Sequence, residues 1–379
     1  MKKCPVAGLC GGCQYQGVDY AEQLSRKEST VRNLVGKFAE VKPIIGMDDP
    51  FHYRNKVQVS FGLDYRKRLH MGNYVVSTHQ IVDVDDCQLA DEKANEIFQT
   101  VKKLALSFRL RIFDEQSLQG LLRHVLIRTT NDGSQIMVVL VTGTPVFPKK
   151  KDFVKALLDS HSEITTIVQN INNRHTSMIL GSRNIVLYGP GYIEDTLCGC
   201  RFRISPSAFY QVNKRQTEVL YKKAIETAEL KKEDVVLDAY CGTGTIGIIA
   251  AGKAGRVEGV EINRAAIADA VRNAKANGRN NITFVCDDAG KYMRRKANEK
   301  VHYDVVIMDP PRAGSDEAFL TSVVRLAPER VVYVSCNPVT LKRDLEFLHR
   351  KHYEVKSIQP VDMFPFTEHV ECVILMTKK

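Results

Sequence analysis

Residues 235–247 have the sequence Val235-Val236-Leu237-Asp238-Ala239-Tyr240-Cys241-Gly242-Thr243-Gly244-Thr245-Ile246-Gly247. A short apolar run followed at once by a glycine-rich turn is typical of a buried strand that leads into a helix. Glycines in such a turn let the backbone bend sharply and approach a ligand that a Cβ atom would exclude. This stretch therefore predicts the first strand and the ligand-binding loop of an α/β domain.

Further apolar runs follow, with helical stretches between most of them. They cover residues 257–261, 282–285, 304–308 and 331–334. Near-continuous apolar strands are expected where a parallel sheet is covered by helices on both faces, so a doubly wound α/β domain is predicted. Two last strands, around residues 355–358 and 370–376, are joined by a short turn. This pair is expected to be antiparallel.

The chain before residue 205 has a different pattern. It opens with a cysteine-rich loop, and a helix is predicted over residues 19–38. Short alternating strands begin near residue 53, as in 56–61 and 135–140, and a helix over residues 91–106 interrupts them. We therefore expect two domains: an N-terminal α+β domain over residues 1–204, and the α/β domain over residues 205–379.

Charge and composition limit the class of protein. The chain has 379 residues, with 54 Lys and Arg against 44 Asp and Glu and a formal charge of +10. A positive excess favours a polyanionic partner, although composition alone does not identify it as nucleic acid. No apolar run approaches the length of a membrane span, and the start, Met1-Lys2-Lys3-Cys4-Pro5, lacks the pattern of an export signal. We expect a cytoplasmic protein with no membrane partner and no obligate protein partner.

An acidic residue ends the second predicted strand of the α/β domain. Glu261 stands about where the acidic residue of dinucleotide-binding folds accepts hydrogen bonds from ribose hydroxyls. The glycine loop does not match GxGxxG strictly and no P-loop lysine follows it, which argues against a ligand with a pyrophosphate. The alternative for Glu261 is an exposed strand-end carboxylate without a ligand.

Three further segments carry reactive side chains. Asp309-Pro310-Pro311-Arg312 follows the fourth strand, Ser335-Cys336-Asn337-Pro338 follows the fifth, and Glu371 stands near the C-terminal end. Strand ends of such a sheet converge on one crevice, so these side chains are expected to face one another.

Covalent catalysis on a pyrimidine needs three kinds of group. A thiolate adds to carbon 6, a second group stabilises the developing oxyanion, and a base removes the proton from carbon 5. Cys336, Arg312 and Glu371 could fill these roles, although Arg312 could equally bind a phosphate. The thiol is expected to be accessible and to have a lowered pKa.

Together with the glycine loop, these motifs resemble the class I S-adenosylmethionine-dependent methyltransferases. Over nearly the whole chain the resemblance is to the RNA uracil-5-methyltransferase family. It includes the segment Ser205-Pro206-Ser207-Ala208-Phe209-Tyr210-Gln211-Val212-Asn213, which resembles the segment before the catalytic sheet in that family. The resemblance implies methyl transfer from S-adenosylmethionine to carbon 5 of a uridine in RNA, with the uridine unpaired or flipped out of its stack.

The resemblance also implies roles for individual residues. Cys336 is expected to be the nucleophile and Glu371 the general base. The residues expected to contact the cofactor are Gln211, Tyr240, Glu261, Asp287 and Asp309, with Asp288 a near-equal candidate for the adenine-reading position of Asp287. Since the mechanism needs one thiol, the neighbouring Cys241, Cys286 and Cys372 are expected to pack in the interior.

The N-terminal cysteines form a second candidate site. Cys4, Cys10 and Cys13 share one loop, and Cys87 could supply a fourth thiol. Four thiolates suit zinc or an iron–sulfur cluster about equally. Ribosomal RNA members of the family resemble this chain here and carry a 4Fe-4S cluster, so the resemblance implies such a cluster and 23S ribosomal RNA as the substrate.

Two alternatives remain for the function. A transfer RNA enzyme would use the same chemistry, although its usual members lack the cysteine loop. A non-catalytic RNA-binding or assembly factor could have kept the fold.

Basic residues of the first predicted domain indicate where RNA is held. Arg54, Lys56 and the run Arg66-Lys67-Arg68 stand near the aromatic residues Tyr53, Phe61 and Tyr65. This mixture suits phosphate contact and base stacking, and an ordinary solvated face is the alternative.

Overall fold

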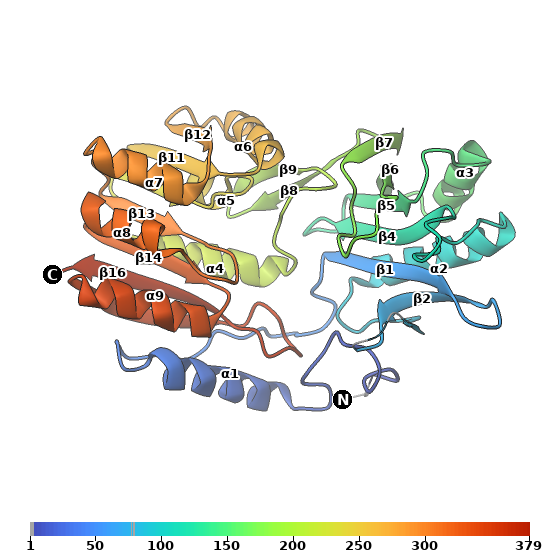
Figure 1. The fold of residues 1–379 in the computed structure, drawn as a ribbon, viewed down its shortest axis with the longest axis horizontal. Helices are drawn as coiled ribbons and strands as arrows, with labels where there is room; N and C mark the ends of the chain where they lie inside the picture. Colours follow the sequence, from blue (N-terminus) through green and yellow to red (C-terminus); the bar gives the residue numbers. More distant parts are fainter. Residues whose placement is uncertain (1–3, 77, 79) are drawn as a thin grey trace.

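Two large sheets form the framework of the molecule (Figure 1). The structure is a computed structural model and describes residues 4–76, 78 and 80–379; residues 1–3, quoted above, lie outside this part. Within the described residues each large sheet has seven strands, and a two-stranded hairpin completes the fold. No helix in the described part of the chain is long and apolar enough to cross a membrane.

The first sheet has the strand order β3-β2-β1-β4-β5-β6-β7. Its strands are β1 (Lys56–Leu63), β2 (Leu69–Tyr74), β3 (Ile81–Asp83), β4 (Leu122–Thr129), β5 (Ile136–Thr142), β6 (Ile164–Ile171) and β7 (Arg183–Tyr188). Helices α2 (Glu92–Ser107) and α3 (Lys150–Ser160) cover one face, where apolar side chains of β1, β4 and β5 pack against them. The predicted strands at 56–61 and 135–140 and the helix at 91–106 are confirmed as β1, β5 and α2.

The second sheet has the strand order β12-β11-β10-β13-β14-β16-β15. Its strands are β10 (Val235–Ala239), β11 (Arg256–Glu261), β12 (Ile282–Cys286), β13 (Val305–Met308), β14 (Arg330–Ser335), β15 (Tyr353–Val361) and β16 (Glu371–Lys378). β10 to β14 are parallel, and β16 is antiparallel to both β14 and β15. The predicted doubly wound sheet and its antiparallel last pair are both confirmed.

Helices α4 (Lys214–Thr227), α5 (Thr245–Ala250), α6 (Arg264–Ala276), α7 (Ala289–Asn298), α8 (Glu317–Leu326) and α9 (Pro338–Arg350) accompany this sheet. An Asp or Asn side chain caps α6 to α9 by accepting backbone N–H bonds of the first turn; the caps are Asn263, Asp288, Asp316 and Asn337. Such caps satisfy donors that have no partner within the helix and fix where it begins. Helices α6, α7 and α9 each start three residues after the preceding strand ends, whereas a longer loop leads from β13 to α8.

Helix α1 (Tyr20–Val35) lies on the second sheet although it precedes the first in sequence. Its Val31 and Val35 are fully buried in the same core as Leu237 of β10. In Figure 1 it runs beside α9, and Val41 in the segment after it pairs with Ile358 of β15. The hairpin of β8 (Ile193–Leu197) and β9 (Cys200–Ile204) also packs against this domain, at α6. Segments on both sides of the first sheet thus join the second, while the predicted boundary at residue 205 stays a prediction.

Candidate active site

A cavity of about 720 Å³ opens at the carboxyl ends of the parallel strands. The structure brings most of the predicted site residues to its wall: Gln211, Tyr240, Glu261, Asp309, Arg312, Cys336 and Glu371. Asp288 also lines it, whereas the Asp287 carboxylate forms an ion pair with Arg295 at 2.9 Å. Which of these two residues contacts the adenine stays a prediction.

The glycine loop forms one end of the cavity. Gly244 has φ +78°, and a Cβ atom there would lie 2.7 Å from the Phe284 ring, so glycine is required on both grounds. Glu261 accepts hydrogen bonds from the backbone N–H of Gly242 at 3.3 Å and of Asn263 at 2.8 Å. These bonds fix the carboxylate between the loop and the start of α6, where it can still accept from a ligand hydroxyl.

Buried carboxyl groups give the cavity its electrostatic character. Burial raises the pKa of Asp238 to about 8, although its carboxylate accepts from Gly247 N–H at 2.8 Å. Burial likewise raises the pKa of Asp309 to about 7. The negative charges of Asp309 and Glu261 add to the rise in the pKa of Asp238. Such a cluster, kept from water, favours a cationic ligand beside it.

The predicted nucleophile lies at the other end of the cavity. Cys336 is half-buried in the turn between β14 and α9 and lines the cavity, so its sulfur is reachable. The Asn337 side chain caps α9 by accepting from Val339 N–H and donates to the Arg312 carbonyl at 3.0 Å. This amide ties the two motifs that follow β13 and β14.

The expected lowered pKa of this thiol is not found. Burial, followed by the nearby Glu371 and Asp309 carboxyls, raises the pKa of Cys336 to about 12, against a smaller opposing effect of Arg312. The expectation considered the requirement of the chemistry alone. It did not include the two carboxyl groups that other strands, β13 and β16, place near the sulfur. The thiol therefore rests in its protonated form at neutral pH.

Glu371 is the first residue of β16 and is only 3% exposed. Burial, and then the charge of Asp309, raises its pKa to about 8, while Arg312 lowers it. A carboxyl with a pKa this close to neutrality can both hold a proton and accept one.

Several cavity residues carried no sequence signal. Tyr221 of α4 is buried, and its hydroxyl interacts with the Gln211 and Thr245 side chains, which orients Gln211. Phe364 and His369 also line the cavity, at its Cys336 end. Apolar periodicity could place Tyr221 only on the inner face of a helix.

The other cysteines near the site are of two kinds. Cys241 and Cys372 are buried, which confirms the expectation that they pack in the interior. Cys286 is exposed at the end of β12, so the same expectation is wrong for this residue.

The N-terminal cysteine loop lies beside the C-terminal part of the chain. Cys13 and Cys87 pack against a small core of Tyr53, Leu89 and Phe366, and Asn73 donates to Cys10 Sγ at 3.3 Å. Burial raises the pKa of Cys13 and of Cys87, and the charge of the nearby Cys10 adds to the rise at both, whereas Arg54 acts in the opposite sense. Among the described residues, however, no three Cys, His, Asp or Glu side chains are arranged to hold a metal ion.

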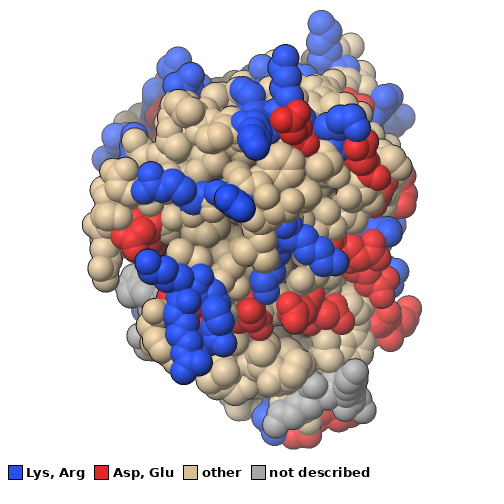
Figure 2. All heavy atoms as spheres, turned by 90° about the vertical axis from the view of Figure 1, so that its right-hand side faces the viewer, with Lys and Arg blue, Asp and Glu red and all other residues tan. Residues whose placement is uncertain are grey.

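The structure separates the expected RNA-contacting residues. Tyr53 is 7% and Phe61 4% exposed, so the expectation that these rings stack on bases is wrong. Tyr65 is 84% exposed in the turn between β1 and β2, with the Arg66 guanidinium 5.1 Å from its ring centroid. Figure 2 shows the face of the molecule on this side: Lys and Arg spread across it, and most Asp and Glu lie toward one edge.

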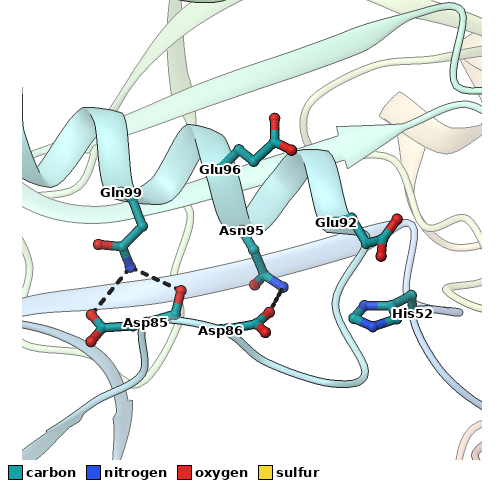
Figure 3. A pocket seen from close by; sticks show the side chains of 7 residues that line it. All are labelled: His52, Asp85, Asp86, Glu92, Asn95, Glu96 and Gln99. Carbon is teal, nitrogen blue, oxygen red and sulfur yellow. Dashed lines mark hydrogen bonds between the residues drawn. The ribbon is translucent and has the colours of Figure 1, made fainter.

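A second, open cavity lies beside Cys87 and is acidic. Figure 3 shows Asp85 held by Gln99 of α2 and Asp86 held by Asn95, with Glu92, Glu96 and His52 around them. Carboxylates repel phosphate groups, so this side of the cysteine loop is unsuited to contact with RNA.

Comparisons with known proteins identify the class and then the family. A solved structure, that of the Pyrococcus abyssi tRNA (uracil-54, C5)-methyltransferase with S-adenosyl-L-homocysteine, matches with a TM-score of 0.82 and 27% identity, over 97% of this chain and 86% of that one. The fold and site are thus those of an S-adenosylmethionine-dependent methyltransferase. A family model described as tRNA (Uracil-5-)-methyltransferase matches residues 19–379.

Curated relatives agree with this assignment. RNA methyltransferases of Oceanobacillus iheyensis and Halalkalibacterium halodurans are 43% and 44% identical; the match covers 98% and 99% of this chain, and 82% and 83% of theirs. The chain belongs to the RNA uracil-5-methyltransferase family. It is an S-adenosylmethionine-dependent enzyme that methylates uracil at carbon 5 in RNA.

The buried carboxyls predict a pH-dependent affinity for the cofactor. A bound sulfonium cation favours their ionised form, so binding should release protons and tighten as pH rises through the pKa values of about 7 and 8. We expect the affinity for S-adenosylmethionine to rise on the order of tenfold between pH 6 and pH 8, with a much smaller rise for the uncharged thioether S-adenosylhomocysteine. Calorimetric titration of both ligands measures this difference, and equal pH dependences would contradict it.

Proposed function

We propose that the protein acts in the cytoplasm on 23S ribosomal RNA and methylates one uridine through a transient bond between Cys336 and carbon 6 of the base. The observation that supports this is the single cavity shared by Cys336, Asp309 and Glu371. These residues stand at the ends of neighbouring strands, β14, β13 and β16. A flipped uracil in the cavity would meet a nucleophile and an acid–base group together.

The cofactor fits the end of the cavity with the glycine loop. Gln211, Tyr240, Glu261 and Asp288 would hold S-adenosylmethionine there, beside the carboxyls that favour its positive charge. When bound, it supplies an electrophilic methyl group. Asp309 stands between the two ends of the cavity, since its charge acts on Asp238 as well as on Glu371.

The chain's own residues account for the remaining chemistry. The Cys336 thiol would give its proton to the nearby Asp309 carboxylate, and the thiolate adds to carbon 6; the proton returns to the sulfur when the thiolate leaves. The electron pair of the ring double bond passes to the carbonyl oxygen, near which Arg312 can stabilise charge. Carbon 5 then accepts the methyl group. The Glu371 carboxylate removes the proton from carbon 5, the double bond re-forms, and the thiolate leaves.

The substrate proposal depends on the cysteine loop. The Pyrococcus abyssi enzyme is named for a tRNA, so a tRNA substrate is the second candidate for this chain. The loop with Cys4, Cys10 and Cys13 favours ribosomal RNA as the substrate, because the ribosomal RNA enzymes of the family are the members that this loop resembles. The exposed Tyr65 with Arg66 and Lys67 would contact RNA away from the target base.

We also propose that a 4Fe-4S cluster is held by four cysteines: Cys4, Cys10, Cys13 and Cys87. The donor set fits in chemistry: Gln16 accepts from the Cys4 N–H and interacts with the Cys13 side chain, and Cys10 and Cys87 lie near Cys13. The Arg54 charge near Cys13 and Cys87 would complement an anionic cluster. The cluster would brace the loop, and no step of methyl transfer passes through it.

The nucleophile and the substrate can be tested in one experiment. Incubation with S-adenosylmethionine and 5-fluorouridine-substituted 23S ribosomal RNA should give a denaturation-resistant protein–RNA complex, since fluorine at carbon 5 cannot leave as a proton does. Substituted tRNA should give little complex. Cys336→Ala should abolish trapping, while Cys286→Ala, which removes an exposed thiol, should trap normally. Preferential trapping on tRNA would refute the ribosomal substrate, and trapping by Cys336→Ala would refute the nucleophile.

The base role of Glu371 predicts a different defect. Glu371→Gln should still form the adduct and transfer the methyl group, but it should release product on the order of 10²- to 10⁴-fold more slowly. The covalent complex should then accumulate on ordinary uridine RNA, as seen on a denaturing gel with labelled RNA. Glu329→Gln, at an exposed position before β14, serves as the control. Normal turnover by Glu371→Gln would remove this residue from the base role.

The cluster predicts an optical signal. Protein purified without oxygen should absorb near about 400 nm and contain iron and sulfide, and Cys13→Ala should lose the band. A Cys198→Ala/Cys200→Ala variant, whose thiols lie in the β8–β9 hairpin, should keep it. Zinc in place of iron in the anaerobic protein would overturn the cluster assignment.

A further inference from the structure

The turn between β15 and β16 forms part of the cavity wall. It spans residues 362–370, between Val361 and Glu371, which face each other in the β15–β16 ladder. Phe364 and His369 of the turn line the cavity, with ring centroids 6.2 Å apart in an edge-to-face arrangement. They lie at the Cys336 end, since the charge of Arg312 acts on His369, Cys336 and Glu371 alike. The glycine loop is at the other end.

Distant parts of the chain bind the backbone of this turn. The five carbonyls from residue 362 to 366 each accept a hydrogen bond from a residue far away in sequence, at 3.0 Å in every case. In order, the donors are Gln216, Asn213, Lys27, Tyr53, and the two backbone N–H groups of Gln14 and Tyr15. Phe366 has φ +67°, and its own N–H donates to the Gln23 side chain. The surroundings of the turn thus hold its backbone, in addition to hydrogen bonds within the turn such as the one from Phe364 N–H to Asp362.

A buried ion pair is the centre of this support. Lys27 Nζ of α1 lies 2.7 Å from Asp362 Oδ1, and both side chains are fully buried. Lys27 also donates to the Phe364 carbonyl, and the Tyr20 hydroxyl donates to Asp362 Oδ2 at 2.9 Å. A buried pair adds little net stability over apolar side chains of the same volume, but it imposes one geometry on the groups that share it. Here the pair fixes the positions of Asp362 and the Phe364 carbonyl, which are part of the turn that lines the cavity.

We propose that the turn is the wall against which the target uracil is held, and that Lys27, through Asp362, is the residue that positions this wall. The inference rests on the proposed function, because it requires that the base enter at the Cys336 end. It also gives α1 and the cysteine loop a role at the active site, since Lys27 and the backbone of Gln14 and Tyr15 hold the same turn. In Figure 1 the red turn extends from the second sheet toward the N-terminal segments.

Lys27→Met tests the proposal because it removes the charge and keeps the bulk of the side chain. The affinity for S-adenosylmethionine should stay within about twofold of wild type, because the glycine loop follows β10, which β13 and β14 separate from the β15–β16 pair. The trapping rate on 5-fluorouridine RNA, and kcat/KM for RNA, should fall on the order of tenfold or more, because a small displacement of the wall misplaces the base. Val35→Ala is the matched control: it destabilises the same helix without touching the turn.

The outcomes separate the positioning role from the proposed function. If wild-type protein is not trapped, the proposed function fails. If wild type is trapped and folded Lys27→Met is trapped as fast as Val35→Ala, or if it loses cofactor affinity in step with trapping, the positioning role fails. Should Lys27→Met not fold, Tyr53→Phe decides, since it removes only the hydroxyl that donates to the Pro365 carbonyl. A trapping rate lowered about threefold or more at unchanged cofactor affinity supports the proposal, and an unchanged rate overturns it.

Discussion

Burial of the side chains at the carboxyl ends of β13 and β14 and at the amino end of β16 is the constraint on which the site depends. In that place Asp309 and Glu371 have pKa values near neutrality, and the Cys336 thiol is held protonated. The same burial that makes the resting thiol unreactive makes Glu371 a usable base. It also makes the cavity attractive to a cation. A thiol kept in its protonated form is a weak nucleophile and is protected from unwanted reactions.

The order of the strands brings these groups together. β16 enters antiparallel beside β14, so the first residue of β16 stands at the edge where the parallel strands end. Glu371 pairs with Val361, and the chain between them must leave the sheet and return. That connection is then fixed by α1, by the cysteine loop and by the start of α4. N-terminal residues therefore support a wall of the cavity that the C-terminal turn forms.

Sequence predicted the second sheet well because its central parallel strands, β10, β13 and β14, are buried. Such strands are continuous apolar runs, and each is followed by a polar residue that caps a helix or faces the crevice. The motif residues were found for the same reason, since strand ends converge. The position of α1 could not be predicted: its apolar face requires a partner but does not identify it.

Properties that depend on neighbouring residues from other strands could not be predicted from the sequence either. The pKa of Cys336 is raised by two carboxyls that stand 27 positions before it and 35 after it in the printed numbering. Tyr53 and Phe61 occur among basic residues in sequence, yet both are in the interior. Lys27 appeared to be one more lysine on a helix, and only its burial against Asp362 distinguishes it.

The most direct test of the central claim is to identify the protein atom that bonds to the base. Enzyme trapped on 5-fluorouridine RNA with S-adenosylmethionine can be digested with nuclease and protease, and the cross-linked peptide sequenced by mass spectrometry. We predict a methylated fluoropyrimidine nucleotide attached to the peptide that contains Cys336, at that sulfur. A nucleotide attached to any other residue would contradict the account, as would its absence in a preparation that methylates unsubstituted RNA.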